Sequence, residues 1–260
     1  MGQRKNLWLP ILVGALYLFL YIPIIIMLVF SFNDNQLGYF WTGFTTKWYS
    51  QLFEAQELWF ALKNSLIVAV SSVILSVTFG VMIVYSLGKK LNSFFSIFYL
   101  SAMVPEIVVA VGLLLVFSWL SIPLSLSSLI AGHTLLGLGF VVPMLHARYA
   151  ELDNSLLEAS ADLGATTRQT FFKVILPFLY PAMVSAAMLV FIISLDDFLI
   201  AFFCAGPTSQ TLSLYIFALI RSGVSPVVNA LSMFMLGVSI ILVSIYSYMS
   251  KKTSSREILS

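Results

Sequence analysis

The chain has 260 residues, of which 60% are hydrophobic and only 9% are Asp, Glu, Lys or Arg. Soluble domains carry about 25% charged residues, so this chain has too little polar surface to coat a water-soluble globule. Its net charge of +2 excludes a strongly basic nucleic-acid-binding surface, and its single cysteine, Cys204, excludes an intrachain disulfide. The composition therefore indicates a protein that lives in a lipid bilayer.

Six apolar runs are long enough to cross a bilayer, which takes about 20 helical residues. Helices are expected because an isolated segment in hydrocarbon must satisfy its own backbone hydrogen bonds. The first run follows Arg4 and Lys5 as a signal peptide would, but it is too long for a signal core, and no small-residue cleavage site follows Phe32. The sequence predicts an all-α polytopic membrane protein, a single transmembrane domain over residues 1–260, with six spans at 7–32, 65–87, 94–120, 127–147, 181–205 and 229–249.

The basic residues predict the orientation of the spans, because cytoplasmic loops are enriched in Lys and Arg. With both termini in the cytoplasm, only Lys47, Lys63 and Arg221 lie outside. The other ten basic residues then lie inside: Arg4, Lys5, Lys89, Lys90, Arg148, Arg168, Lys173, Lys251, Lys252 and Arg256. The opposite orientation would invert this ratio.

Both of the longer outer loops contain apolar or aromatic segments. The loop over residues 33–64 is rich in Trp, Tyr and Phe. This composition suits either an aromatic belt on a helix at the membrane surface or a docking surface for an external protein. The loop over residues 206–228 contains the apolar segment 212–220, which is too short to span and suits a re-entrant or surface helix.

The connection between the fourth and fifth spans, residues 148–180, carries helix signals. Ser155 and Glu158 have the spacing of a capping box, which begins a helix. Gly164 is placed to end that helix in a left-handed conformation. The small residues 159–161 then form a knob that is expected to face the cytoplasm.

A second short helix is expected directly after the first. Thr166 and Gln169 repeat the capping-box spacing, Leu176-Pro177 is expected to stop the helix, and Pro181 suits the first turn of the fifth span. Residues 148–180 then form a helix–turn–helix elbow. An ordinary loop folded against the inner face of the bundle is the simpler interpretation, but far fewer than thirty ordered residues would join the two spans. We therefore expect the elbow to have a use.

The elbow resembles the EAA motif of permease subunits in type I ABC importers. That motif reads Glu-Ala-Ala, three residues, Gly, nine residues, Ile, any residue and Leu-Pro. The spacing agrees throughout with Glu158-Ala159-Ser160, Gly164 and Val174 to Pro177. Ser160 replaces the second Ala and Val174 replaces the Ile, both with little change in size. The resemblance implies that Glu158, Ala159, Ser160 and Gly164 seat a coupling helix in a groove of a cytoplasmic ATPase.

The resemblance extends over essentially the whole chain, including Trp41 to Phe44, Lys47 to Tyr49 and Ser194 to Phe198, and it is to permeases of bacterial polyamine importers. It implies half of a translocation pathway for spermidine or putrescine in the bacterial inner membrane. The implied partners are a homologous permease subunit, a dimer of cytoplasmic ATP-binding subunits, a periplasmic substrate-binding protein and membrane lipid, with no nucleic acid and no cofactor. The sequence has no Gly-x-x-x-x-Gly-Lys-Ser/Thr phosphate loop, so ATP hydrolysis is expected on another subunit.

Three acidic residues lie inside predicted spans, where a charge costs about 2.5–3.5 kcal/mol even on lenient insertion scales. Glu106 is expected near the middle of the third span, after Pro105, which is expected to bend the helix, while Asp196 and Asp197 lie further toward the outside on the fifth. No Lys or Arg inside the spans balances them, which favours cations such as polyamines. We expect the three acids to line the substrate pathway and at least one of the two aspartates to contact substrate. Alternatively, one aspartate caps a helix break and only the other lines the pathway, and Glu106 makes only a structural hydrogen bond to a neighbouring helix.

His133 and the glycines of the third and fourth spans have simpler interpretations. A lone imidazole on an apolar segment is expected to be a buried hydrogen-bonding residue, and neither it nor His146 has partners at metal-ligand spacing. Four glycines are expected to be close-packing points between helices: Gly112, Gly132, Gly137 and Gly139.

Other functions would need other features. The nearest alternative is an ABC permease for an amino acid, thiamine or Fe(III). A membrane-embedded enzyme would have only Glu106 with His133 as a candidate catalytic pair. A proton- or sodium-coupled secondary transporter would need inverted repeats and broken helices, neither of which is evident in the sequence. We therefore expect a transport subunit and not an enzyme.

Overall fold

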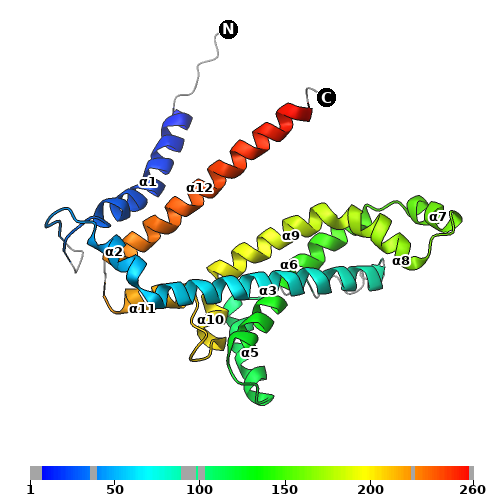
Figure 1. Cartoon of the computed structure of the whole chain (residues 1–260), viewed down its shortest axis with the longest axis horizontal. Coiled ribbons are helices and arrows are strands. Elements are labelled where there is room, and N and C mark those ends of the chain that lie inside the picture. Colours follow the sequence, from blue (N-terminus) through cyan, green and yellow to red (C-terminus); the bar gives the residue numbers. More distant parts are fainter. Residues whose placement is uncertain (1–7, 36–39, 89–97, 99–102, 224–225, 258–260) are drawn as a thin grey trace, which may run out of the picture. The chain divides into compact units, whose positions relative to one another are not determined.

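The computed structural model describes residues 8–35, 40–88, 98, 103–223 and 226–257, with side chains up to residue 241 (Figure 1). Within these residues the chain is helical, apart from turns and one isolated bridge between Asn33 and Phe44. It separates into two compact units, one formed by residues 1–56 with 216–260 and the other by residues 57–215. The prediction of an all-α protein is confirmed for the described part of the chain.

The first unit contains α1 (Trp8–Phe30), α2 (Lys47–Glu54) and α12 (Pro226–Glu257). Helix α1 has no buried residue and packs beside α12, so nearly its whole apolar surface is open to lipid or to another protein. Between α1 and α2, the buried Asn33 side chain donates to the carbonyl of Phe40 (2.7 Å) and accepts from the amide of Thr42 (3.0 Å). These bonds tie the backbone at Phe40 and Thr42 to Asn33.

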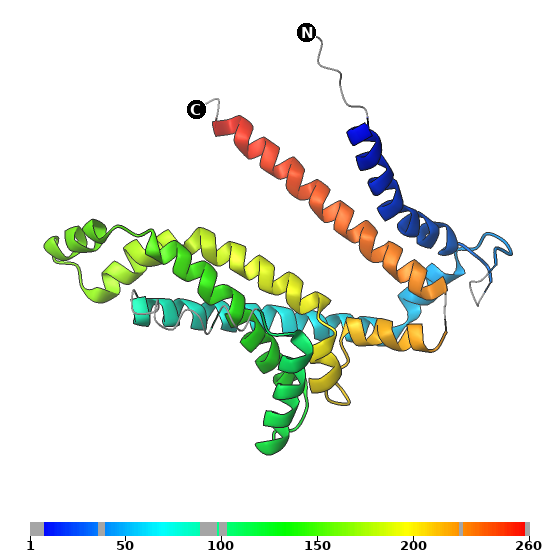
Figure 2. The ribbon, with the colours of Figure 1, turned by 180° about the vertical axis from the view of Figure 1, so that it is seen from behind.

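The second unit contains the helices that build the interior. These are α3 (Gln56–Leu87), α5 (Glu106–Trp119), α6 (Leu126–Ala150), α9 (Leu176–Asp196) and α10 (Leu199–Cys204), followed by the start of α11 (Leu212–Arg221). Helices α6 and α9 lie side by side in both views (Figures 1 and 2). Their apolar faces meet α3 in one core that includes Val84, Val141 and Val190. A second core, around Ile200, joins α10 to α5 and α6.

Glycine permits the close approach of these helices at two of the predicted positions. A Cβ atom added at Gly137 would lie 2.4 Å from the Ser76 hydroxyl, and one at Gly132 would lie 2.9 Å from an Ile200 methyl group. Gly112 is different, because a Cβ there would meet no atom of this chain within 4 Å. The prediction of a packing point is therefore confirmed at Gly132 and Gly137 and wrong at Gly112, whose side of α5 faces open space in this chain.

Among the residues that the structure describes, four helical segments are long and apolar enough to cross a membrane: residues 8–30, 56–87, 126–150 and 167–196. Shorter apolar helices cover residues 106–119, 212–221 and 226–241. The third predicted span, 94–120, lies partly outside the described residues. The fifth, 181–205, is wrong in its bounds, because the helix breaks after Asp196 and begins earlier than Pro181.

Candidate functional site

Asp197 interrupts the fifth apolar run. Helix α9 ends at Asp196, Asp197 has an extended backbone (φ −60°, ψ 128°), and α10 begins at Leu199. The Asp197 carboxylate accepts hydrogen bonds from the amides of Ile200 (3.2 Å) and Ala201 (2.9 Å). Asp side chains favour helix caps because they satisfy amides that have no partner inside the helix. The expectation of an unbroken helix is thus wrong, and the alternative of a capping aspartate is confirmed.

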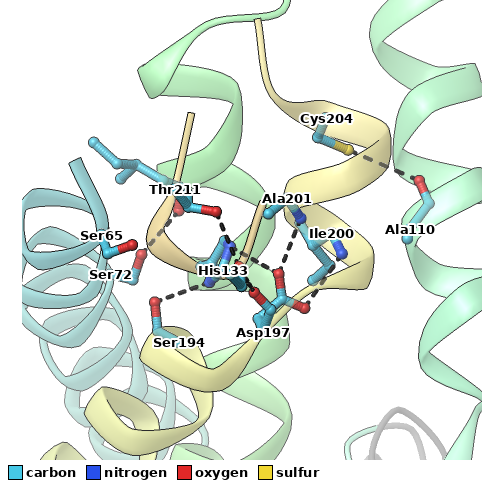
Figure 3. A network of polar contacts seen from close by, with 12 residues as sticks. Ser65, Ser72, Ala110, His133, Ser194, Asp197, Ile200, Ala201, Cys204 and Thr211 are labelled. Carbon is cyan, nitrogen blue, oxygen red and sulfur yellow. Dashed lines mark hydrogen bonds and ion pairs between the residues drawn. The ribbon is translucent and has the colours of Figure 1, made fainter. Parts of the chain in front are cut away.

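His133 on α6 reaches across to both sides of this break (Figure 3). Its Nδ1 lies 2.8 Å from the Ser194 hydroxyl, and its Nε2 lies 3.3 Å from Asp197 Oδ2. The side chains of His133 and Asp197 are 1% and 0% exposed. The Nε2 contact is not aligned for a hydrogen bond, and Nε2 is the one buried side-chain nitrogen or oxygen in the described part of the chain without such a bond. His133 is therefore a buried hydrogen-bonding residue, as predicted, with one atom left unsatisfied.

Glu106 completes the buried acid cluster, which consists of Glu106, His133, Ser194 and Asp197. Pro105 lacks an amide hydrogen and precedes α5, so Glu106 opens the first turn of a helix and does not lie in the middle of one. Its carboxyl is half-buried and lies close enough to Asp197 for the two charges to interact. Two ionised carboxylates that interact repel each other unless a proton or a cation lies between them. The cluster thus presents negative charge where α5, α6 and the break of α9 meet.

Asp196 has a different environment from Asp197, although the two are neighbours in sequence. It is exposed and is the last residue of α9. The C-terminal end of a helix carries partial negative charge, which disfavours an anion. Asp196 is therefore an exposed charge, whereas Asp197 is a buried helix cap.

Irregular backbone follows α10, and polar side chains from α3 and α11 satisfy it. The Asn64 amide donates to the carbonyl of Gln210 (3.0 Å), and the Ser65 hydroxyl accepts from the amide of Leu212 (2.8 Å). Ser213 donates to the Asp197 carbonyl (2.6 Å). Non-helical backbone at membrane depth is tolerated only where protein or water satisfies it. The sequence analysis did not assign these residues, although polar side chains at helical spacing in an apolar run are a usable signal.

The elbow has the predicted two helices with one different boundary. Helix α7 (Asn154–Asp162) is capped by Asp153, whose carboxylate accepts from the Ser155 amide (3.0 Å). The predicted capping box at Ser155 is therefore wrong. Gly164 has a left-handed backbone (φ +74°), as predicted, and Thr166 with Gln169 forms the predicted capping box of α8 (Thr167–Thr170). Ser160 and Thr170 share a hydrogen bond between hydroxyls (2.8 Å) that braces the two arms.

The second arm of the elbow continues into α9 without a stop. A π-helical turn, η2 (Phe171–Ile175), joins α8 to α9, so residues 167–196 form one helical segment. Pro177 would clash with the carbonyl of residue 173 in a regular α-helix. The wider π turn accommodates it, which is why the predicted stop at Leu176-Pro177 is wrong.

The elbow presents an open surface and has a packed base. Leu163 is 87% exposed, and a groove of about 460 Å³ is lined by residues that include Ala159, Ser160 and Gly164. At the base, Ile175 and Leu179 pack against Leu152. There the Arg148 guanidinium also lies over the Phe178 ring, 4.1 Å from its centroid. The four predicted coupling residues thus lie together on a segment anchored to α6 and α9.

Comparison with known proteins identifies the family. Residues 76–255 match the model of the binding-protein-dependent transport system inner membrane component family, which is more than half of the chain. The chain belongs to this family. It is 39% identical over 235 residues to the spermidine/putrescine transport system permease protein PotC of Escherichia coli (strain K12), with 88% of each chain covered. It is 30% identical over 244 residues to the putrescine transport system permease protein PotI of the same organism, covering 90% of this chain and 87% of that one.

Solved structures give the same fold. The chain aligns with a bacterial ABC transporter involved in the import of the acidic polysaccharide alginate with a TM-score of 0.73 and 18% identity, covering 95% of this chain and 99% of that one. The protein is therefore a multi-pass permease component of the inner membrane with an ABC permease fold, and ATP is hydrolysed on a partner ATPase. Because the chain belongs to this family, the two alternatives of a membrane-embedded enzyme and a secondary transporter are set aside. The helix broken at Asp197 is a feature that secondary transporters also have, but it does not change this conclusion.

Proposed function

We infer that this chain is a permease subunit of an ATP-driven importer of polyamines and forms half of the translocation pathway. The buried acid cluster carries this proposal. Glu106 and Asp197 are close enough for their charges to interact, Asp196 is next to Asp197 in the chain, and α5, α9 and α10 contain no Lys or Arg. Such a site favours a cation with several ammonium groups. The names of the relatives PotC and PotI support the same substrate class.

The remaining parts of the assembly follow from this role. A homologous permease subunit would supply the other half of the pathway, a dimer of ATP-binding subunits would drive it, and a periplasmic protein would deliver spermidine or putrescine. The chain would form one transmembrane domain over residues 1–260 with six spans and both termini in the cytoplasm. The excess of basic residues in the predicted inner loops supports this orientation.

Coupling would pass through the elbow. Glu158, Ala159, Ser160 and Gly164 would meet the ATPase, with the exposed Leu163 beside them. The elbow is packed at its base and continuous with α9, so a push on it moves α6 and α9 as a unit. These helices hold His133 and Asp196, and Asp197 follows α9 directly. Closure of the ATPases would therefore open the acid cluster toward the outside, and ATP hydrolysis would reverse the movement.

Uptake by the reconstituted transporter tests the substrate class. The complete complex in proteoliposomes, supplied with its binding protein and internal ATP, is expected to accumulate labelled spermidine or putrescine. An excess of unlabelled polyamine should abolish this uptake, whereas an amino acid, thiamine or Fe(III) should not. ATP-dependent uptake of one of those three solutes, with no polyamine uptake, would establish the alternative importer instead.

A further inference from the structure

We propose that the segment after α1 is a lipid anchor, which places the rings of Phe40, Trp41 and Phe44 in the headgroup layer of the membrane surface at which α1 ends. The sequence left two interpretations of this loop open, an aromatic belt on a surface helix and a docking surface for an external protein. The structure favours lipid as the occupant, but it assigns the contact to a ribbon of backbone and not to a helix. The proposal is independent of the transported substrate.

The aromatic ribbon consists of residues 40–45, paired with residues 32–34. The amide of Asp34 donates to the carbonyl of Gly43 (2.9 Å), and the amide of Thr45 donates to the carbonyl of Phe32 (2.8 Å). The rings of Phe32 and Phe44 are stacked, with their centroids 5.2 Å apart. The end of the ribbon is therefore held against the residues that directly follow α1.

The ribbon presents large aromatic side chains outward. Phe40 is 75% exposed, Trp41 49% and Phe44 71%. The backbone beside these rings is tied down, since the buried Asn33 side chain donates to the Phe40 carbonyl (2.7 Å). Apolar surface of this extent is unfavourable in water, and a contiguous patch of it marks a site of contact with a membrane or a protein.

Helix α2 does not serve as the lipid-facing belt, because its apolar side is used inside the protein. Trp48 and Leu52 are 4% and 1% exposed, and the Trp48 indole donates to the Asn33 carbonyl (2.7 Å). The Phe53 ring packs edge-on against Phe234 of α12. The other exposed side chains of α2 are polar: Lys47, Ser50, Gln51 and Glu54. The ribbon, and not α2, thus presents the unpartnered aromatic surface.

The length of α1 places the ribbon at the membrane surface. The helix has 23 apolar-rich residues, none of them buried in this chain. A helix of this length rises about 34 Å, slightly more than the hydrocarbon core of about 30 Å. Phe30 therefore reaches the polar layer, and the ribbon begins directly after it at Phe32. This level is the same whether lipid or a partner subunit covers α1.

The chemistry of the ribbon suits this layer. Trp and Tyr are enriched where the membrane meets water, because their rings are apolar and one edge is polar. Exposed Lys47 and Asp34 form an ion pair beside the rings, which suits the polar side of the same layer. Rings at the level of the headgroups meet lipid from the side, whereas an external protein approaches only from above. The geometry therefore favours phospholipid as the occupant.

Photocrosslinking tests the occupant in the complete transporter, reconstituted in vesicles of phosphatidylethanolamine and phosphatidylglycerol with loaded binding protein present. Benzoylphenylalanine, a photoreactive phenylalanine, is placed at Phe44 or, as the matched control, at exposed Gln51 on the polar side of α2. Mass spectrometry of this chain should find at least about threefold more phospholipid adduct at position 44 than at position 51. Crosslinking of position 44 to the binding protein or to another subunit, or equal lipid yields at both positions, would overturn the proposal.

Fluorescence gives a second measurement with a milder substitution. The emission lost in Trp41→Phe is the emission of Trp41, and it can be compared in vesicles whose lipids carry bromine near the headgroup or near the chain ends. Bromine near the headgroup should quench this emission at least about twofold more strongly, because the ring is expected at that depth. Equal emission in brominated and ordinary lipid would mean that the ring touches no lipid and would refute the anchor. A complex that imports no polyamine would refute the proposed function but would leave both of these results valid.

Discussion

The elbow and the buried acid cluster belong to the same unit of the chain but are built on different principles. The elbow is made from neighbours in sequence: Asp153 caps α7, Gly164 ends it, and Thr166 begins α8. The acid cluster joins residues that are far apart, since His133 and Ser194 are 61 positions from each other. The surface proposed to meet another protein is thus specified locally, whereas the site proposed to meet substrate exists only after the helices have packed.

The largest effect that separates the two regions is expected from Gly164→Trp. The space beside Gly164 is open, so the side chain would project outward and obstruct a docked ATPase, and uptake should fall at least about tenfold, which corresponds to about 1.4 kcal/mol. The left-handed backbone (φ +74°) strains any side chain at this position, so the thermal stability of the permease should fall about as much as in Gly164→Ala. Uptake and ATPase activity of the reconstituted complex measure the effect.

Smaller residues at the same position serve as controls. Gly164→Asn is much smaller than Trp and tolerates a left-handed backbone, whereas Gly164→Ala adds only a methyl group but is strained by about 1–2 kcal/mol. If Asn impairs coupling as strongly as Trp, the obstruction argument fails. If Ala alone matches Trp, backbone conformation and not docking is responsible. Unchanged transport in Gly164→Trp would contradict the coupling role itself.

The next effect concerns the helices that hold the acid cluster together. Gly137→Ala places a methyl group 2.4 Å from the Ser76 hydroxyl, where α6 meets α3, and such overpacking costs about 1–3 kcal/mol. We expect a lower Tm of the complex and a parallel loss of uptake. Gly112→Ala is the matched control, because the same methyl group meets open space in this chain. Equal losses in both variants would show that helix propensity or a partner contact at Gly112, and not close packing at Gly137, explains the effect.

The same contrast explains what could be predicted from the sequence. Gly164 and the Thr166 capping box were predictable because each depends on a few adjacent residues. The cap of α7 was misplaced because Asp153 and Ser155 are both good caps two positions apart, and spacing alone does not rank them. The helix through Pro177 was missed because a π turn relieves the expected clash.

In the acid cluster, the two acids Glu106 and Asp197 could be identified from the sequence, but their arrangement could not. Glu106, Asp196 and Asp197 were recognisable because acids are expensive in an apolar run. The break at Asp197 was offered only as an alternative, since an apolar run of 25 residues reads as one span. The partnership with His133 and Ser194 depends on the packing of α6 against α9, which no local pattern records.

A smaller effect tests the corrected boundary of the elbow. Asp153→Ala removes the observed cap of α7 and should destabilise the elbow by about 1 kcal/mol, while Asp153→Asn should preserve it. Hydrogen exchange of the first amides of α7 in the purified complex measures the local change. Ser155→Ala should have almost no effect, because the Ser155 hydroxyl is not the observed cap. A larger effect at Ser155 than at Asp153 would restore the original capping box.

The smallest effect is expected at the brace between the two arms of the elbow. Ser160→Ala and Thr170→Val each remove one hydroxyl of the 2.8 Å contact, and the net value of such a hydrogen bond is about 0.5–1.5 kcal/mol. If the brace fixes the angle at which α7 meets the ATPase, each variant should lower the ratio of uptake to ATP hydrolysis slightly, and the double variant no further. Additive losses would mean that the two hydroxyls act separately. A loss from Ser160→Ala alone would instead assign Ser160 to the contact with the ATPase, which would place it among the docking residues and leave the angle of the elbow to its packed base.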